Sequence, residues 1–129
     1  MLLLPSSVRI FLAAEPVDLR RGVDGLAALV RAQGHDVYGG HLFCFGGRRR
    51  DRLKILVWDR GGFVLYYKRL EAGRFRWPEV PEGAREIVFD ATQLAMLLDG
   101  IDVRQVRRPK AWTPACRKLD TPAGMPDQA

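Results

Sequence analysis

Residues 41–69, HLFCFGGRRRDRLKILVWDRGGFVLYYKR, decide the fold of this chain. They contain three runs rich in β-branched and aromatic residues, at 41–45, 53–58 and 63–68, and such runs are typical of strands. The DRGG sequence at 59–62 supplies the glycines that a tight hairpin requires, whereas a longer, heavily charged connection separates the first two runs. The sequence therefore predicts a three-stranded meander with antiparallel neighbours.

A strand and a helix are expected before the meander. Residues 8–12 have strand composition and are followed by a turn. Apolar residues then recur at helical spacing from Leu19 until Gly34, and Asp18 is the expected N-cap. Gly22 and Gly25 fall inside this predicted helix, which indicates either close packing against that face or simple tolerance of glycine.

A second strand and helix are expected after the meander. Residues 86–89 form the predicted strand, and Asp90 with Gln93 forms a capping-box variant at the start of a helix that ends at Gly100. The predicted fold class is α+β: an antiparallel meander of about four to five strands with two short helices packed on it. Residues 1–103 are expected to form one domain, and residues 104–129 a basic, proline-containing, flexible tail.

The composition indicates a globular cytoplasmic protein. A chain of 129 residues is long enough for one core, and its apolar runs are far shorter than the roughly 20 residues that cross a bilayer. The N-terminus lacks the pattern of a signal peptide. Cys44 and Cys116 do not form a disulfide framework, so reduced thiols are expected. The sequence leaves the oligomeric state open.

Positive charge is concentrated in the predicted meander and the segment after it. Between Gly47 and Arg76 ten basic residues face three acidic ones, a local excess of +7 against +6 for the whole chain. Arginine and lysine neutralise phosphates, and exposed aromatic rings stack on bases. The alternative is that Trp58, Tyr66 and Tyr67 pack in the core beside a solvated arginine loop. We expect the arginines between the first two strands of the meander to form one continuous cationic surface with the later lysines and arginines. The predicted nucleic-acid-binding residues are Arg48, Arg49, Arg50, Arg52, Lys54, Lys68, Arg69, Arg74 and Arg76.

Enzymatic patterns are weak. His35 and His41 have no cysteine or acidic neighbour at metal-ligand spacing, and the chain has no phosphate-binding loop or serine elbow. We therefore expect no catalytic residues, no metal and no cofactor, and the protein is not expected to be an enzyme. A metal-dependent nuclease is the weakest alternative, with carboxylates drawn from Asp18, Asp24, Asp51, Asp59 and Asp90.

Several long, ordered motifs resemble one family. They are GHLF at 40–43, RRDRLKIL at 49–56, WD at 58–59, GF at 62–63, YKRLE at 67–71 and GRFRWP at 73–78, flanked by VDLRRGVDGL at 17–26, QL at 93–94 and LLDGI at 97–101. This pattern resembles the TnpB accessory proteins of the insertion-sequence-sixty-six (IS66) family of bacterial transposable elements, over roughly residues 8–102. The chain departs from the family pattern at Val37-Tyr38 and at Gly46-Gly47.

The resemblance implies an accessory protein that assists DNA transposition. Its expected partners are the DNA ends of the element, a separate transposase and a second accessory protein of the same element, with no membrane involved. Two mechanisms stay open: the basic surface binds DNA, or it docks an acidic surface of the transposase without direct DNA contact.

Overall fold

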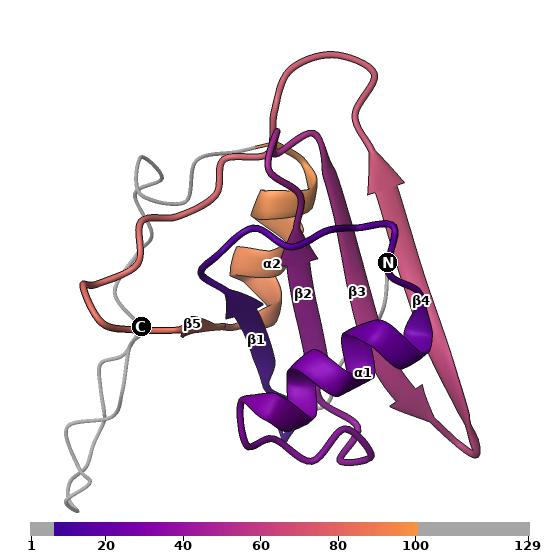
Figure 1. Ribbon diagram of the computed structural model, residues 1–129. Helices are drawn as coiled ribbons and strands as arrows, with labels where there is room; N and C mark the ends of the chain where they lie inside the picture. Colours follow the sequence, from indigo (N-terminus) through magenta and orange to yellow (C-terminus); the bar gives the residue numbers. More distant parts are fainter. Residues whose placement is uncertain (1–6, 101–129) are drawn as a thin grey trace, which may run out of the picture.

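The computed structural model describes residues 7–100, and the order of elements in them is β1 (Ile10–Ala13), α1 (Val23–Ala32), β2 (Leu42–Gly46), β3 (Arg52–Asp59), β4 (Gly62–Arg69), β5 (Glu86–Phe89) and α2 (Ala91–Leu98). These strands form one sheet in the order β4-β3-β2-β1-β5. Helix α1 lies across one face of the sheet and α2 lies on the other (Figure 1). The expected α+β class, with two short helices packed on a mostly antiparallel sheet, is confirmed.

The meander of β2, β3 and β4 is confirmed, and both of its strand pairs are antiparallel. Asp59 pairs with Gly62, so the β3–β4 hairpin turns through Arg60 and Gly61 alone. Both turn residues have positive φ, 46° and 88°, as a two-residue turn that follows the strand twist requires. This short turn fixes the register along eight residues of each strand.

The first strand pairs in a way that the meander did not predict. β1 runs parallel to β2, with Ile10 opposite Leu42, and antiparallel to β5 on its other side. Parallel neighbours need a long crossover connection, and α1 supplies it between β1 and β2. The sheet is therefore mixed, with one parallel pair.

Helix α1 starts later than predicted, and Asp18 as its N-cap is wrong. The N-cap is Gly22, which has extended backbone and no side-chain hydrogen bond. The Asp18 carboxylate instead accepts hydrogen bonds from the backbone N–H and the guanidinium of Arg20. Gly22 thus lies outside the helix. A Cβ at Gly25 would lie 3.1 Å from the Arg21 Cβ, so Arg21 packs closely against this glycine.

Helix α2 begins and ends as predicted. The backbone N–H of Gln93 donates to Asp90 over 2.7 Å, and the Gln93 side chain accepts from the Asp90 N–H over 2.9 Å, so the capping box is complete. Gly100, with a φ of 78°, follows the C-cap. Neither described helix, at ten and eight residues, has the length and apolarity to cross a membrane.

The core has two layers because alternate residues of each strand point to opposite faces. Leu12, Cys44 and Leu53 pack with α2 on one face, while Phe43, Phe45 and Leu56 pack with α1 on the other. We refer to these as the α2 face and the α1 face. The predicted tail, residues 104–129, lies outside the described residues.

Candidate nucleic-acid interface

Four arginines surround a pocket at the end of the sheet where β2 leaves and β3 begins. The pocket measures about 560 Å³ and is lined by Arg20, Arg48, Arg49 and Arg52, together with the ring of Tyr67. Asp18 and Asp51 also line it, so its charged side chains carry a net excess of positive charge. We call this site the arginine pocket. Three of the predicted binding residues meet there.

The connection between β2 and β3 places Arg48 and Arg49 at its exposed tip. The N–H of Arg50 donates to the Gly47 carbonyl over 3.0 Å, and the N–H of Gly47 donates to the Arg52 carbonyl over 3.2 Å, so the loop closes as a tight turn. Arg50 has a φ of 62° and directs its side chain away from the two preceding arginines, to a second pocket. The turn therefore sorts adjacent arginines into two sites.

Two further predicted cations flank the arginine pocket on the α1 face. Arg69 is the cross-strand partner of Arg52, and Lys54 is the partner of Tyr67. The Nζ of Lys54 donates to the Arg21 carbonyl over 2.9 Å and lies 5.4 Å from the centre of the Tyr67 ring. The Arg69 guanidinium donates to Glu71, which raises the pKa of Arg69. The Arg21 carbonyl thus positions Lys54, and the Glu71 carboxylate positions Arg69.

An exposed aromatic ring and an ion pair complete the arginine pocket. Tyr67 is 48% exposed, so its ring is available to a planar ligand. Arg20 Nη2 lies 2.7 Å from Asp18 Oδ2, and these hydrogen bonds lower the pKa of Asp18 and raise that of Arg20. The Arg20 charge is therefore partly neutralised, whereas no ion pair within residues 7–100 involves Arg48, Arg49 or Arg52.

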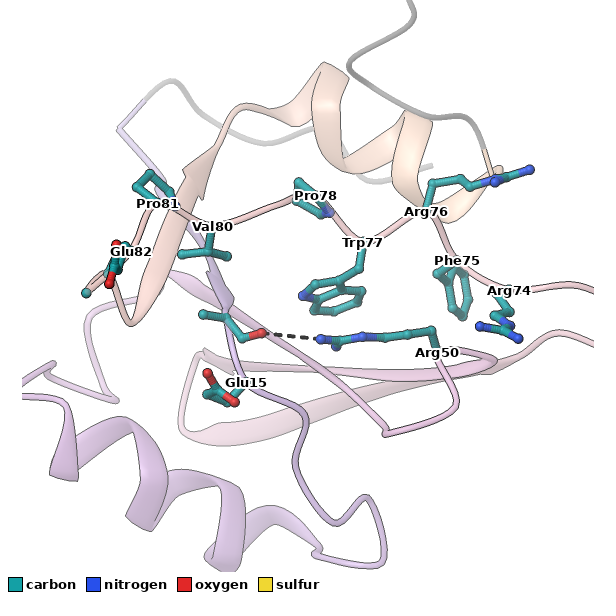
Figure 2. A pocket seen from close by; sticks show the side chains of 13 residues that line it. Glu15, Arg50, Arg74, Phe75, Arg76, Trp77, Pro78, Val80, Pro81 and Glu82 are labelled. Carbon is teal, nitrogen blue, oxygen red and sulfur yellow. Dashed lines mark hydrogen bonds between the residues drawn. The ribbon is translucent and has the colours of Figure 1, made fainter.

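Arg50 belongs to a different site, which Figure 2 shows. Its guanidinium lies 4.4 Å from the centre of the Trp77 ring and donates through Nη2 to the Ala14 carbonyl over 3.3 Å. Nη1 is buried and has no hydrogen-bond partner among the described residues. Burial lowers the pKa of Arg50, and Glu15 opposes this effect. Arg50 is thus a half-buried packing residue and does not line the arginine pocket.

Arg74 and Arg76 lie beside this second pocket, which measures about 590 Å³. Both side chains are exposed, and Arg76 points away from Arg50 (Figure 2). Glu15 and Glu82 line the same pocket, so its charge is mixed. These two predicted residues therefore line a different pocket from Arg48, Arg49 and Arg52.

Lys68 lies on the opposite face of the sheet from Lys54. It is paired with Leu53, whose side chain belongs to the α2 face, and its Nζ donates to the Leu98 carbonyl at the end of α2 over 2.7 Å. The expectation of one continuous cationic surface is therefore wrong. The nine predicted cations divide into the arginine pocket with its flanks, the Trp77 pocket, and Lys68.

Residue patterns did not identify Arg20 and Tyr67 as site residues. Arg20 lines the pocket only because the segment before α1 folds over the end of β2, where Val17 N–H donates to the Gly46 carbonyl. Tyr66 and Tyr67 are 43% and 48% exposed, so neither packs in the core, while Trp58 is half-buried against Tyr38 and Phe63. The hairpin register was the available signal for Tyr67, since it pairs this residue with Lys54.

No group of three or more histidine, cysteine or acidic side chains that could hold a metal ion occurs within residues 7–100. Asp59 ends β3 at the hairpin and Asp90 caps α2, as predicted. His35 contacts Glu86 over 2.7 Å and packs on Phe11, and the His41 ring accepts from the Arg9 N–H. Both histidines therefore have structural contacts.

Comparisons with known proteins point to one family. The family profile described as "IS66 Orf2 like protein" matches residues 8–108. The uncharacterized protein y4jC of Sinorhizobium fredii is 41% identical over 102 residues, which cover 78% of this chain and 86% of that protein. The uncharacterized protein y4hO of the same organism is 38% identical over 115 residues, covering 87% and 96%. No solved structure matches the chain significantly.

Proposed function

Because the chain belongs to the IS66 Orf2-like family, we propose that it is an accessory protein of a bacterial insertion sequence that assists transposition by binding DNA. The observation that carries this proposal is the arginine pocket. It gathers Arg48, Arg49 and Arg52 around an open cavity, beside an exposed tyrosine ring.

Free guanidinium groups suit phosphate. Arginine presents a planar fork of N–H donors that matches phosphate oxygens, and each neutralised phosphate releases condensed counterions. Lys54 extends the positive charge along the α1 face from the pocket. Arg69 lies next to Arg52 on the same face, but its charge is partly neutralised by Glu71, 3.0 Å away. Tyr67 adds a surface on which an unpaired base can stack. The proposed DNA-binding residues are therefore Arg48, Arg49 and Arg52, with Lys54 and Arg69 as flanks.

A salt titration tests this proposal. Binding of a duplex from the element ends is measured by fluorescence anisotropy at several salt concentrations, for the natural chain and for a variant with Arg48, Arg49 and Arg52 changed to Ala. For duplex DNA the slope of log affinity against log salt changes by about 0.9 per phosphate contact. We expect the slope of the variant to be shallower by about 3 such contacts, with much weaker binding.

The matched control removes the same charge elsewhere. Arg9, Arg31 and Arg85 are exposed and do not line the arginine pocket. Changing these three to Ala should leave the salt slope close to that of the natural chain. If both variants lose the same amount of DNA affinity and salt slope, only the net charge of the chain matters. An unchanged salt slope in the pocket variant would reject phosphate binding in the arginine pocket.

A second experiment separates DNA binding from protein docking. The tagged chain is co-purified with the transposase of the same element from extract that has been treated with nuclease. If DNA bridges the two proteins, treatment removes the transposase. If the complex survives and the pocket variant still forms it, docking by another surface is favoured over the DNA-binding proposal.

A further inference from the structure

The outer edge of β4 is a long strand edge that no described element pairs with. β4 is terminal in the strand order and spans Gly62–Arg69. Leu70 N–H donates to the Asp51 carbonyl, so even-numbered residues of this strand direct their backbone groups to β3. Phe63, Leu65 and Tyr67 consequently direct their N–H and C=O groups outward. This edge is a template for another strand.

The side chains of β4 lack the usual protection of an edge strand. Natural sheets guard such edges with proline, bulges, or charges in the middle of the strand. Residues 62–67 contain none of these, and Val64, Tyr66 and Tyr67 are 43–48% exposed. The other edge differs, since β5 has only four residues and begins with Glu86. The unprotected edge is therefore a property of β4 alone among the described strands.

We propose that β4 pairs antiparallel with β4 of a second copy of this chain, so that two sheets join into one. The register that fits centres on Leu65, which pairs with Leu65 of the second copy. Phe63 then pairs with Tyr67 through the outward backbone groups, and Val64 lies opposite Tyr66 on the α2 face. This goes beyond the proposed function and does not depend on DNA.

The charges at the end of the strand favour this register and this occupant. With Leu65 at the centre, Lys68 lies opposite Gly62 of the second copy, so the apolar residues meet each other and the cations lie at the ends. A shift by two residues in one direction would place Lys68 opposite Val64 and Arg69 opposite Phe63. A shift by two residues in the other direction would place Tyr66 opposite Gly62, which has no side chain for the ring to contact. The sequence of β4 is thus complementary to itself.

Charge substitution tests the pairing and its register. We expect the natural chain to sediment at about twice its 14.6 kDa mass in the absence of DNA. Val64→Lys and Tyr66→Glu should each give monomers, because both place a charge in the apolar centre. Mixing the two variants should restore a dimer, since Lys at 64 of one copy faces Glu at 66 of the other. Circular dichroism checks that each variant is folded.

A matched control uses the opposite edge of the sheet. Val88 on β5 is 54% exposed, close to the 48% of Val64, so Val88→Lys adds the same charge and should remain dimeric. A monomeric natural chain at the highest reachable concentration would overturn the proposal, as would dimers that persist in both β4 variants. Monomers that fail to recombine on mixing would overturn the Leu65-centred register.

Discussion

Gly46 is the residue on which the packing of Arg50 depends. A Cβ at this position would lie 2.6 Å from Arg50 Nη1 and 2.8 Å from the Trp77 ring, closer than any real contact. We expect Gly46→Ala to lower the free energy of unfolding by about 1–3 kcal/mol, the usual cost of overpacking. Urea denaturation measures it. Gly62→Ala is the control, because a Cβ there meets nothing within 4 Å, and comparable losses would contradict this account.

Cys44 gives a pH dependence of stability. It is fully enclosed at the centre of the sheet, and burial raises the pKa of its thiol from 9.0 to about 12. In the unfolded chain the thiol ionises at lower pH, so its contribution to stability is complete below pH 9.0 and is lost as the pH rises towards 12. The free energy of unfolding should fall by about 1.4 kcal/mol per pH unit in that window through this group.

The measurement compares two variants. In a Cys116→Ser background, which leaves one thiol, Cys44 and Cys44→Ala chains are unfolded in urea across that pH range. The Ala chain should be less stable at neutral pH because it leaves a cavity, yet its stability should fall less steeply with pH. Parallel curves for the two chains would show that the Cys44 thiol ionises equally in both states.

Lys68 connects β4 to the end of α2. Its ammonium donates to the last carbonyl of the helix, where positive charge is also favoured by the helix dipole. We expect Lys68→Met to lower the free energy of unfolding by about 1 kcal/mol and to leave DNA affinity unchanged. Lys54→Met loses a similar bond, to the Arg21 carbonyl, but flanks the arginine pocket. Lys54→Met should therefore lower both the free energy of unfolding and the affinity for DNA.

The opposite placement of these two lysines follows from the hairpin. A two-residue turn at Arg60 and Gly61 makes Asp59 and Gly62 partners, and counting back pairs Lys54 with Tyr67 rather than with Lys68. Partners share a face and their neighbours point the other way. The turn was predictable from the sequence, so this parity was available too. The alternation within one strand shows which residues share a face with each lysine. Only the register between the two strands shows that Lys54 and Lys68 lie on opposite faces of the sheet.

Other elements show where local sequence stops being informative. The meander and the Asp90 cap depend on residues within a few positions, and both were predicted. The parallel pairing of β1 with β2 depends on a crossover of about 30 residues, which is a tertiary choice. Asp18 has the chemistry of an N-cap, but the neighbouring Arg20 binds its carboxylate and the helix begins at Val23. Arg20 thus occupies the carboxylate that was expected to cap the helix.

The same distinction applies to the site in the whole molecule. The charge excess of residues 47–76 was visible in the sequence, and it contains most of the arginine pocket. Which arginines share a pocket was not visible, because Arg48 and Arg50 are separated by the backbone turn and Arg20 arrives from another segment. Grouping by sequence therefore found the segment that supplies most of the pocket lining, but it joined cations that the fold separates.

If two copies pair through β4, the fold also sets the spacing of their arginine pockets. A two-fold axis perpendicular to the sheet keeps both α1 faces on one side. Arg69 then lies eight positions along the ribbon from Arg69 of the second copy, and Arg52 lies one strand further in on each side. At about 3.3 Å per residue and about 4.8 Å per strand, the two Arg52 positions are roughly 30 Å apart. This is close to the 34–36 Å turn of B-DNA.

One duplex should therefore occupy both pockets of a dimer at once. The natural chain and Val88→Lys should bind a two-turn duplex with a salt slope about twice that of the monomeric Val64→Lys chain, because twice as many phosphates are neutralised. Both variants carry the same added charge, so the difference reports pairing alone. Equal slopes for a dimeric and a monomeric chain would mean that the two pockets do not engage one duplex, even where each binds DNA separately.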